Sequence, residues 1–186
     1  MISELYFDIF MNDQRKEVLY LRSGFLDETI VKALSDAVPF GAWLPFAVSL
    51  HTGLRIGDVL ALRMVNVHPD HIDFIAAKTG KIGKAPITPE LYRRLQWSAS
   101  GSKWAFPGRK AGKHLTRQAA WYRLKSAARR AGVRAAGISP HSCRKTFAVR
   151  VLRETGDIHA VQERLQHERL SDACLYAFSD RWSDSH

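Results

Sequence analysis

The alternation of hydrophobic and polar positions predicts a chain made mostly of helices. The apolar segment over residues 40–50 is typical of a buried helix, and Gly53 just beyond it suits a left-handed C-terminal cap. Residues 27–38 also look helical, because Asp27 opens the segment and Pro39 stops it. Further helices are expected at 55–63, from Thr88 and Pro89 onward, at 116–131, from Ser139 and Pro140 to about Gly156, from Asp157 to about Gln166, and from Ser171 and Asp172 through Tyr176.

One stretch between these helices has the period of a β-hairpin. Residues 71–77 alternate partly as a strand, residues 78–81 form a turn, and residues 84–87 return as a second strand. The absence of a strand–helix–strand alternation disfavours a nucleotide-binding α/β fold. The expected fold is therefore mainly α with a small antiparallel β-sheet (α+β). It forms one domain over residues 26–186, with a lead-in or linker over residues 1–25.

The charge of the chain is unevenly placed and favours a polyanion as partner. The net charge is +10, yet residues 1–50 carry a net charge of −3, and residues 51–186 carry +13. Between residues 78 and 134 there are 15 Lys and Arg residues against a single acid, Glu90. A soluble basic surface usually pairs its charges with more acids than this, so a nucleic-acid-binding surface is the stronger interpretation.

Composition also limits the cellular compartments in which the protein is expected. The chain lacks a run of 18 apolar residues and lacks a basic start followed by an apolar segment, so neither a membrane partner nor secretion is expected. Two cysteines are too few for a disulfide scaffold. These features predict a cytoplasmic protein, associated with the nucleoid when it is bound to DNA.

Six side chains at fixed spacings are what an enzyme needs to attack a phosphodiester without a metal. Each alone has an ordinary explanation: an arginine would pair with a nearby acid, a turn lysine would be solvated, and a tyrosine would pack. As a set they offer two guanidinium groups for a phosphate, two imidazoles and an ammonium for proton transfer, and a phenol as nucleophile. The six are Arg55, Lys78, His141, Arg144, His167 and Tyr176.

Metal chemistry is not favoured by the sequence, and no cofactor is expected. His68 and His71 have a spacing that suits metal ligands, but they flank a turn with no nearby cysteine or third histidine. Asp70 and Asp73 are close in sequence and lack a third carboxylate, so a two-metal nuclease site is not indicated either.

The ordered set resembles the catalytic domain of the tyrosine recombinases, the phage integrase family. Arg55 stands in Thr-Gly-Leu-Arg-Ile-Gly-Asp-Val, Lys78 in a hairpin turn, and His141 three residues before Arg144. Tyr176 follows His167 by nine residues, and the similarity covers roughly residues 25–180. Two departures are Gln166, where glycine is usual, and Lys145, where histidine is common. Most of the family carry a further N-terminal domain, so the chain is interpreted either as a minimal recombinase or as a fragment of a longer protein.

The resemblance implies a role for each of the six residues. Tyr176 is expected to attack the scissile phosphate and form a 3′-phosphotyrosyl link, which a 5′-hydroxyl then reverses. Arg55 and Arg144 are expected to bind the non-bridging oxygens, and Lys78 to protonate the leaving 5′-oxygen. His141 is expected to assist proton transfer at the tyrosine, and His167 to contact the phosphate or position the nucleophile.

The expected partner is double-stranded DNA. The helix at 116–131 is the predicted major-groove element. The candidate DNA contacts are Arg117, Gln118 and Arg123 on that helix and Lys81 and Lys84 on the hairpin, the two lysines also competing with Lys78 for its role. The resemblance further implies a homo-tetramer assembled on DNA, and it leaves room for a directionality factor or a host DNA-bending factor.

Two rival interpretations stay open at the level of sequence. A type IB topoisomerase shares the tyrosine chemistry but acts as a monomer, and a DNA-binding relative would keep the fold without cutting. The target site, and the choice among integration, excision, inversion and dimer resolution, are not encoded in these patterns.

Overall fold

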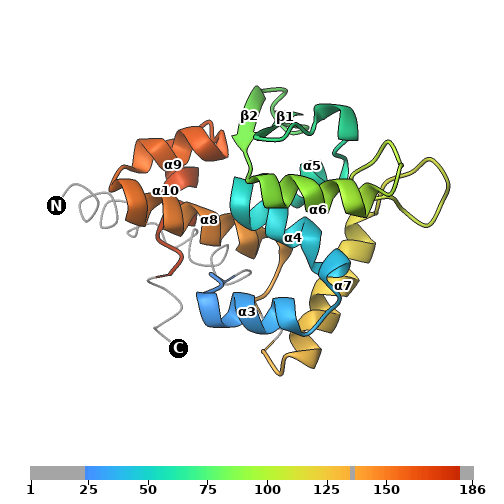
Figure 1. Cartoon of the computed structure of the whole chain (residues 1–186). Helices are drawn as coiled ribbons and strands as arrows, with labels where there is room; N and C mark the ends of the chain where they lie inside the picture. Colours follow the sequence, from blue (N-terminus) through green and yellow to red (C-terminus); the bar gives the residue numbers. More distant parts are fainter. Residues whose placement is uncertain (1–23, 135–136, 181–186) are drawn as a thin grey trace.

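The computed structural model describes residues 24–134 and 137–180. Within this part of the chain, helices make up most of the structure and one two-stranded antiparallel sheet lies at its edge, which confirms the predicted fold class (Figure 1). The proposed lead-in lies almost entirely outside the described residues. The elements are α3 (Glu28–Asp36), α4 (Phe40–Thr52), α5 (Ile56–Leu60), a 3₁₀ turn η1 (Met64–Asn66), β1 (His71–Ile75), β2 (Ile82–Pro86), α6 (Pro89–Ala99), α7 (Arg117–Arg130), α8 (Pro140–Thr155), α9 (Ile158–Leu165) and α10 (Leu170–Ala177).

Side-chain caps fix most of the predicted helix starts. A cap side chain accepts a hydrogen bond from a backbone N–H of the first turn, which would otherwise have no partner. The capping oxygens belong to Asp27 in α3, Thr88 in α6, Thr116 in α7, Ser139 in α8 and Asp157 in α9. In α8 the cap is reciprocal, because the Ser142 side chain also accepts from the Ser139 N–H at 3.1 Å.

The hairpin differs from its prediction in both strands. The first strand ends at Ile75 and not at residue 77, because the Ala76 carbonyl already accepts the N–H groups of Thr79 and Gly80 in the turn. The second strand occupies Ile82–Pro86 and not residues 84–87, since Ile75 pairs with Ile82. The connection between the strands, residues 76–81, therefore begins two residues earlier than predicted.

Two predicted helix boundaries were also wrong. The helix expected over 55–63 ends at Leu60, because Arg63 forms a β-bridge with Trp104 instead of continuing the helix. The last helix begins at Leu170, so the predicted cap by Ser171 and Asp172 is wrong.

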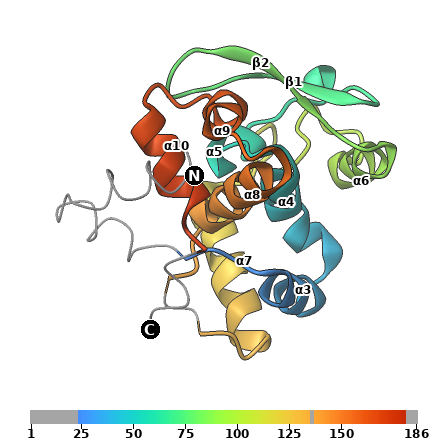
Figure 2. The ribbon, with the colours of Figure 1, turned by 90° about the vertical axis from the view of Figure 1, so that its left-hand side faces the viewer.

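Helix α8 lies at the centre of the molecule and joins two apolar cores. One core gathers buried side chains of α3, α4, α6 and α7, and the other is formed between α8, α9 and α10. Figures 1 and 2 show α9 and α10 on one side of α8, with α7 and α3 on the other. The hairpin lies beside α5 and α9 (Figure 2). The ends of α4, α8, α9 and α10 therefore meet near the hairpin turn.

Among the described residues, every helix is too short or too polar to cross a membrane.

Candidate active site

The turn between α4 and α5 places the first arginine. Gly53 ends α4 with a φ of 71°, a left-handed conformation that favours glycine, and its N–H donates to the Ser49 carbonyl at 2.9 Å. A Cβ at this position would lie 2.6 Å from Cδ1 of Phe147, so a larger residue would not fit. The chain then turns sharply, and Arg55 becomes the N-cap residue of α5 with a half-buried side chain.

Arg144 joins this turn to the turn between α9 and α10. Its side chain is 3% exposed, and its guanidinium donates to the Gly53 carbonyl, to the Leu165 carbonyl at 3.0 Å and to Nε2 of His167 at 3.1 Å. Burial and the nearby Arg55 charge lower the pKa of Arg144 to about 10, which still leaves the group charged at neutral pH. The site thus contains a buried cation held by backbone acceptors.

His167 accepts a hydrogen bond from Arg144 in its neutral form. Burial is the largest cause that lowers its pKa to about 3, followed by the positive charges of Arg144 and Arg55. An imidazole with this pKa is uncharged at neutral pH, so Nε2 carries the lone pair that Arg144 requires. The His167 N–H donates to the Gln162 carbonyl at 2.9 Å and its carbonyl accepts from the Gln162 side-chain amide at 3.3 Å, which hold the His167 backbone against α9.

Tyr176 reaches the same point from α10. Its hydroxyl lies 3.1 Å from Nδ1 of His141, and the edge of the His167 ring meets the tyrosine ring with centroids 5.0 Å apart. Burial raises the pKa of Tyr176, while the charges of Arg144 and Arg55 oppose that rise. Burial first, and then the charge of Arg144, lowers the pKa of His141. A neutral imidazole therefore lies within hydrogen-bond distance of a phenol whose pKa is raised by burial, and two guanidinium groups offset part of that rise.

Lys78 lies on the turn of the hairpin, on the open side of this cluster. Its side chain is exposed, and its charge is one of those that lower the pKa of His167. The Ala77 N–H donates to Oδ1 of Asp58 at 3.2 Å, so α5 holds the turn that carries Lys78. An exposed ammonium on an anchored turn can approach a phosphodiester that enters from solvent.

The other hairpin lysines differ from Lys78 in their surroundings. Lys84 lies 3.3 Å from Nε2 of His71 and 3.9 Å from a carboxylate oxygen of Asp73, so its ammonium faces the base of the hairpin. Lys81 is exposed beside the turn. The structure therefore separates Lys84 from the turn position that Lys78 occupies.

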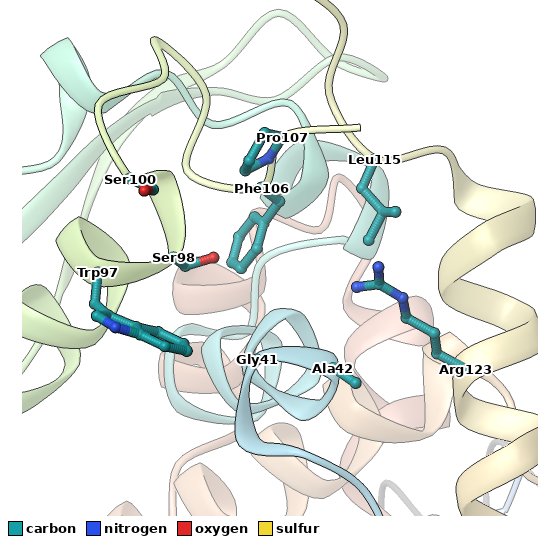
Figure 3. A pocket seen from close by; sticks show the side chains of 9 residues that line it. All are labelled: Gly41, Ala42, Trp97, Ser98, Ser100, Phe106, Pro107, Leu115 and Arg123. Carbon is teal, nitrogen blue, oxygen red and sulfur yellow. The ribbon is translucent and has the colours of Figure 1, made fainter. Parts of the chain in front are cut away.

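The predicted DNA-contacting side chains of α7 are all exposed, but they face different surroundings. The Arg117 guanidinium packs over Gly57, where a Cβ would lie 2.3 Å from Nη2, and its charge lowers the pKa of His141. Arg117 is thus a neighbour of the candidate catalytic cluster, which sequence reasoning did not predict. Figure 3 shows Arg123 elsewhere, beside a pocket that Trp97 and Phe106 also line.

Two further side chains touch the cluster without having been candidates. Lys145 is buried, its pKa is lowered to about 8 by burial, and its charge acts on His141. Gln166 adopts a left-handed φ of 52°, and its amide lies so close to Gly83 of β2 that a Cβ there would be 2.5 Å away. The only sequence signal for both was their difference from the residues usual at these positions.

All six predicted catalytic side chains therefore gather in one cluster, although they are spread over the sequence from residue 55 to residue 176. One hydrogen bond joins Arg144 to His167, and another joins His141 to Tyr176. The charges of Arg55 and Lys78 lower the pKa of His167. The arrangement provides a nucleophile, a proton acceptor and a cationic pocket.

Comparisons with known proteins show the family of the chain. The sequence profile of the Phage integrase family matches residues 28–181. The tyrosine recombinase XerD of Rhizobium meliloti is 35% identical over 133 residues, which are 67% of this chain and 43% of that protein. The chain thus spans less than half the length of this relative.

Solved structures share the fold. The catalytic domain of bacteriophage HP1 integrase superposes with a TM-score of 0.63 at 24% identity, covering 84% of this chain and 88% of that one. A lambda integrase tetramer bound to a Holliday junction superposes with a TM-score of 0.65 at 17% identity, covering 80% of this chain and 48% of that one.

Proposed function

This chain belongs to the phage integrase family of tyrosine recombinases, and we propose that it cuts and rejoins DNA as a site-specific recombinase. The observation that carries the proposal is the 3.1 Å contact between the Tyr176 hydroxyl and Nδ1 of His141, beside the buried Arg144 guanidinium. A phenol in this position has both a proton acceptor and a cation that stabilises its anion.

The proposed reaction proceeds by direct displacement at phosphorus. The Tyr176 oxygen forms a bond to the scissile phosphorus, the bond to the 5′-oxygen breaks, and the product is a 3′-phosphotyrosyl link. The phenol proton passes to His141, and Lys78 supplies a proton to the departing 5′-oxygen. A 5′-hydroxyl from a partner strand then reverses these steps, so the energy of the phosphodiester bond is retained.

Arg55 and Arg144 neutralise the charge that develops on the phosphate. A guanidinium presents N–H groups in a planar fork that matches two phosphate oxygens. In a buried site these donors are already oriented before the reaction begins, which is where electrostatic stabilisation is most effective. His167 holds Arg144 in this orientation through its Nε2.

The proposed substrate is double-stranded DNA, bound through the basic surface between residues 78 and 134. We assign residues 26–186 to the catalytic domain and Lys81, Lys84, Arg117, Gln118 and Arg123 to DNA contacts. A tetramer assembled on two DNA sites is proposed by analogy with the lambda integrase tetramer on a Holliday junction. Directionality or DNA-bending factors would act on that assembly.

A nicked DNA duplex that traps the covalent intermediate tests the proposal. Wild-type protein should form a protein–DNA adduct that survives denaturation, and excess EDTA should not prevent it, because the proposed catalytic groups are cations, imidazoles and a phenol. Tyr176→Phe should abolish the adduct and leave DNA binding nearly unchanged, since only one oxygen is lost.

The matched control is Tyr122→Phe, which removes the hydroxyl of an exposed tyrosine on α7. An adduct that persists in Tyr176→Phe and is lost in Tyr122→Phe would place the nucleophile on α7. Relaxation of supercoiled DNA without junction formation would favour topoisomerase activity, and DNA binding without any adduct would indicate a relative that no longer cuts.

A further inference from the structure

Three side chains with metal-binding atoms meet at the base of the β1–β2 hairpin. They are His68, just before β1, and His71 and Asp73 on β1 itself, and their ligand atoms all lie within 4.8 Å of one another. The sequence pattern of two histidines lacked a third ligand. The fold supplies Asp73 as that third ligand.

Backbone pairing explains why these three side chains converge. Residues 71 and 73 are two apart on one strand, so they share a face of the hairpin. The preceding segment folds back on β1 through a bridge between Val67 and Ile72, and the His68 N–H donates to the His71 carbonyl at 2.8 Å. The same tight turn of the chain before β1 stacks the His68 and His71 rings, whose centroids are 4.5 Å apart.

The distances are close to those of a tetrahedral metal site. Ligands about 2.1 Å from a zinc ion in tetrahedral geometry lie about 3.4 Å from one another. Nε2 of His68 is 2.9 Å from Oδ2 of Asp73, and Nε2 of His71 is 3.5 Å from Oδ1 of Asp73. Small rotations of exposed or half-buried side chains are sufficient to bring all three to one ion.

The hydrogen bonds prepare His71 as a ligand. Nδ1 of His71 lies 2.7 Å from Oδ1 of Asp70, so that nitrogen carries the proton and Nε2 keeps its lone pair. A carboxylate bound to the second nitrogen of a ligating histidine is the arrangement that orients metal ligands in proteins. Nε2 also faces a cation, the Lys84 ammonium, at 3.3 Å.

We propose that His68, His71 and Asp73 bind a late first-row divalent metal ion, with Zn²⁺ as the reference case. Two imidazoles and one carboxylate suit this class of ion, and water completes the fourth position. The ion takes the place of the Lys84 ammonium, whose side chain is 71% exposed and free to turn toward solvent. It also replaces the proton that His68 Nε2 shares with Asp73.

The bound ion would link the segment before β1 to β1 itself, and so make the hairpin whose turn carries Lys78 more rigid. Its role is structural and is distinct from the reaction at Tyr176. Metal binding and DNA cleavage are therefore separable, and the test uses protein without DNA.

Calorimetric titration with Zn²⁺ measures the affinity of the protein after removal of any affinity tag, and Co²⁺ reports coordination through its visible absorption. The wild-type protein should bind one Zn²⁺, and Co²⁺ should give the intense bands of a four-coordinate ion. His71→Ala and Asp73→Asn should each weaken Zn²⁺ binding at least tenfold. Asp70→Asn should weaken it by about ten- to a hundredfold through the lost orientation of His71.

Two matched variants complete the design. His159→Ala removes an exposed histidine outside the cluster and should leave affinity unchanged, whereas Lys84→Ala removes the competing cation and should tighten binding severalfold. Asp73→Asn conserves shape, so its loss of binding cannot be attributed to unfolding when its circular dichroism matches the wild type. Equal affinities for the wild type, His71→Ala and Asp73→Asn would overturn the proposal, as would a Co²⁺ spectrum typical of the hydrated ion.

Discussion

Replacement of Arg144 by lysine should impair catalysis far more than folding. Lysine keeps the positive charge but offers one compact ammonium in place of the planar fork. In the folded chain the Arg144 guanidinium serves three acceptors on two separate turns: the carbonyls of Gly53 and Leu165, and Nε2 of His167. A lysine side chain reaches at most one of these turns at a time.

The magnitude follows from the contacts that are lost. At least one buried carbonyl is left without its donor, which costs about 1–3 kcal/mol of the free energy of unfolding. The free energy of unfolding of most domains of this size is about 5–15 kcal/mol, so Arg144→Lys should remain folded at low temperature. The rate should fall about a hundredfold or more, equivalent to about 2.7 kcal/mol, because the phosphate loses its bidentate partner.

The assay is single-turnover formation of the covalent adduct at saturating DNA, at a temperature well below the melting temperature of the variant. Arg150→Lys is the matched control. Arg150 also lies on α8 and donates from its guanidinium to two backbone carbonyls, those of Leu50 and His51, both at 3.2 Å. Its replacement should cost some stability and leave the rate near that of the wild type. A wild-type rate in Arg144→Lys, or equal rate losses in the two variants, would refute the assigned role.

Three further predictions concern binding, pH and the hairpin. If the basic surface neutralises about six phosphates, the slope of log affinity against log salt should be roughly −5, and a flat response would contradict that interpretation of the surface. The folded-state pKa of His167 is about 3 against an ordinary 6.5, so below pH 6.5 the unfolded chain binds a proton that the native chain does not. Stability to urea should therefore fall by up to about 1.4 kcal/mol per pH unit between pH 6.5 and 3, and equal slopes in the wild type and His167→Asn would refute this cause. Gly83→Ala should shift β2, because the new Cβ would lie 2.5 Å from the Gln166 amide and 2.9 Å from the Phe74 ring, and adduct formation should slow while DNA binding stays near normal. An unchanged rate would show that the position of the hairpin does not control catalysis.

Helix starts were predictable because their determinants are local. The caps by Thr88, Thr116, Ser139 and Asp157 each require only a side chain and a backbone N–H two or three residues away. The start of α10 was missed because its N-cap residue, Arg169, makes no side-chain cap hydrogen bond and leaves no such signal.

The register of the hairpin was missed because alternation does not show where the turn begins, which is at Ala76, whose carbonyl accepts the N–H groups of Thr79 and Gly80. β2 begins at Ile82, two residues earlier than predicted, and passes Gly83 under Phe74 and Gln166. Gln166 arrives from the turn after α9. The local alternation of hydrophobic and polar residues contains no information about Gln166.

The candidate catalytic residues could be selected from the sequence as a set, whereas their surroundings could not. Fixed order and spacing selected His141 and Tyr176, and the structure brings them within 3.1 Å across 35 residues of sequence. The placement of Arg117 over Gly57 depends on how α7 packs against α5. The convergence of Asp73 with the two hairpin histidines likewise depends on the return of the chain before β1.

Arg144 explains why the folding and the chemistry of this site are difficult to separate. A nearly buried guanidinium must have its N–H groups paired, since an unpaired buried charge is strongly destabilising. Its backbone acceptors lie at the C-terminal ends of α4 and α9, where carbonyls are left over because the helices stop. Both ends are formed by a left-handed residue, Gly53 in one case and Gln166 in the other. One arginine of α8 thus satisfies both helix ends, and its guanidinium carbon lies 5.9 Å from the centroid of the Tyr176 ring.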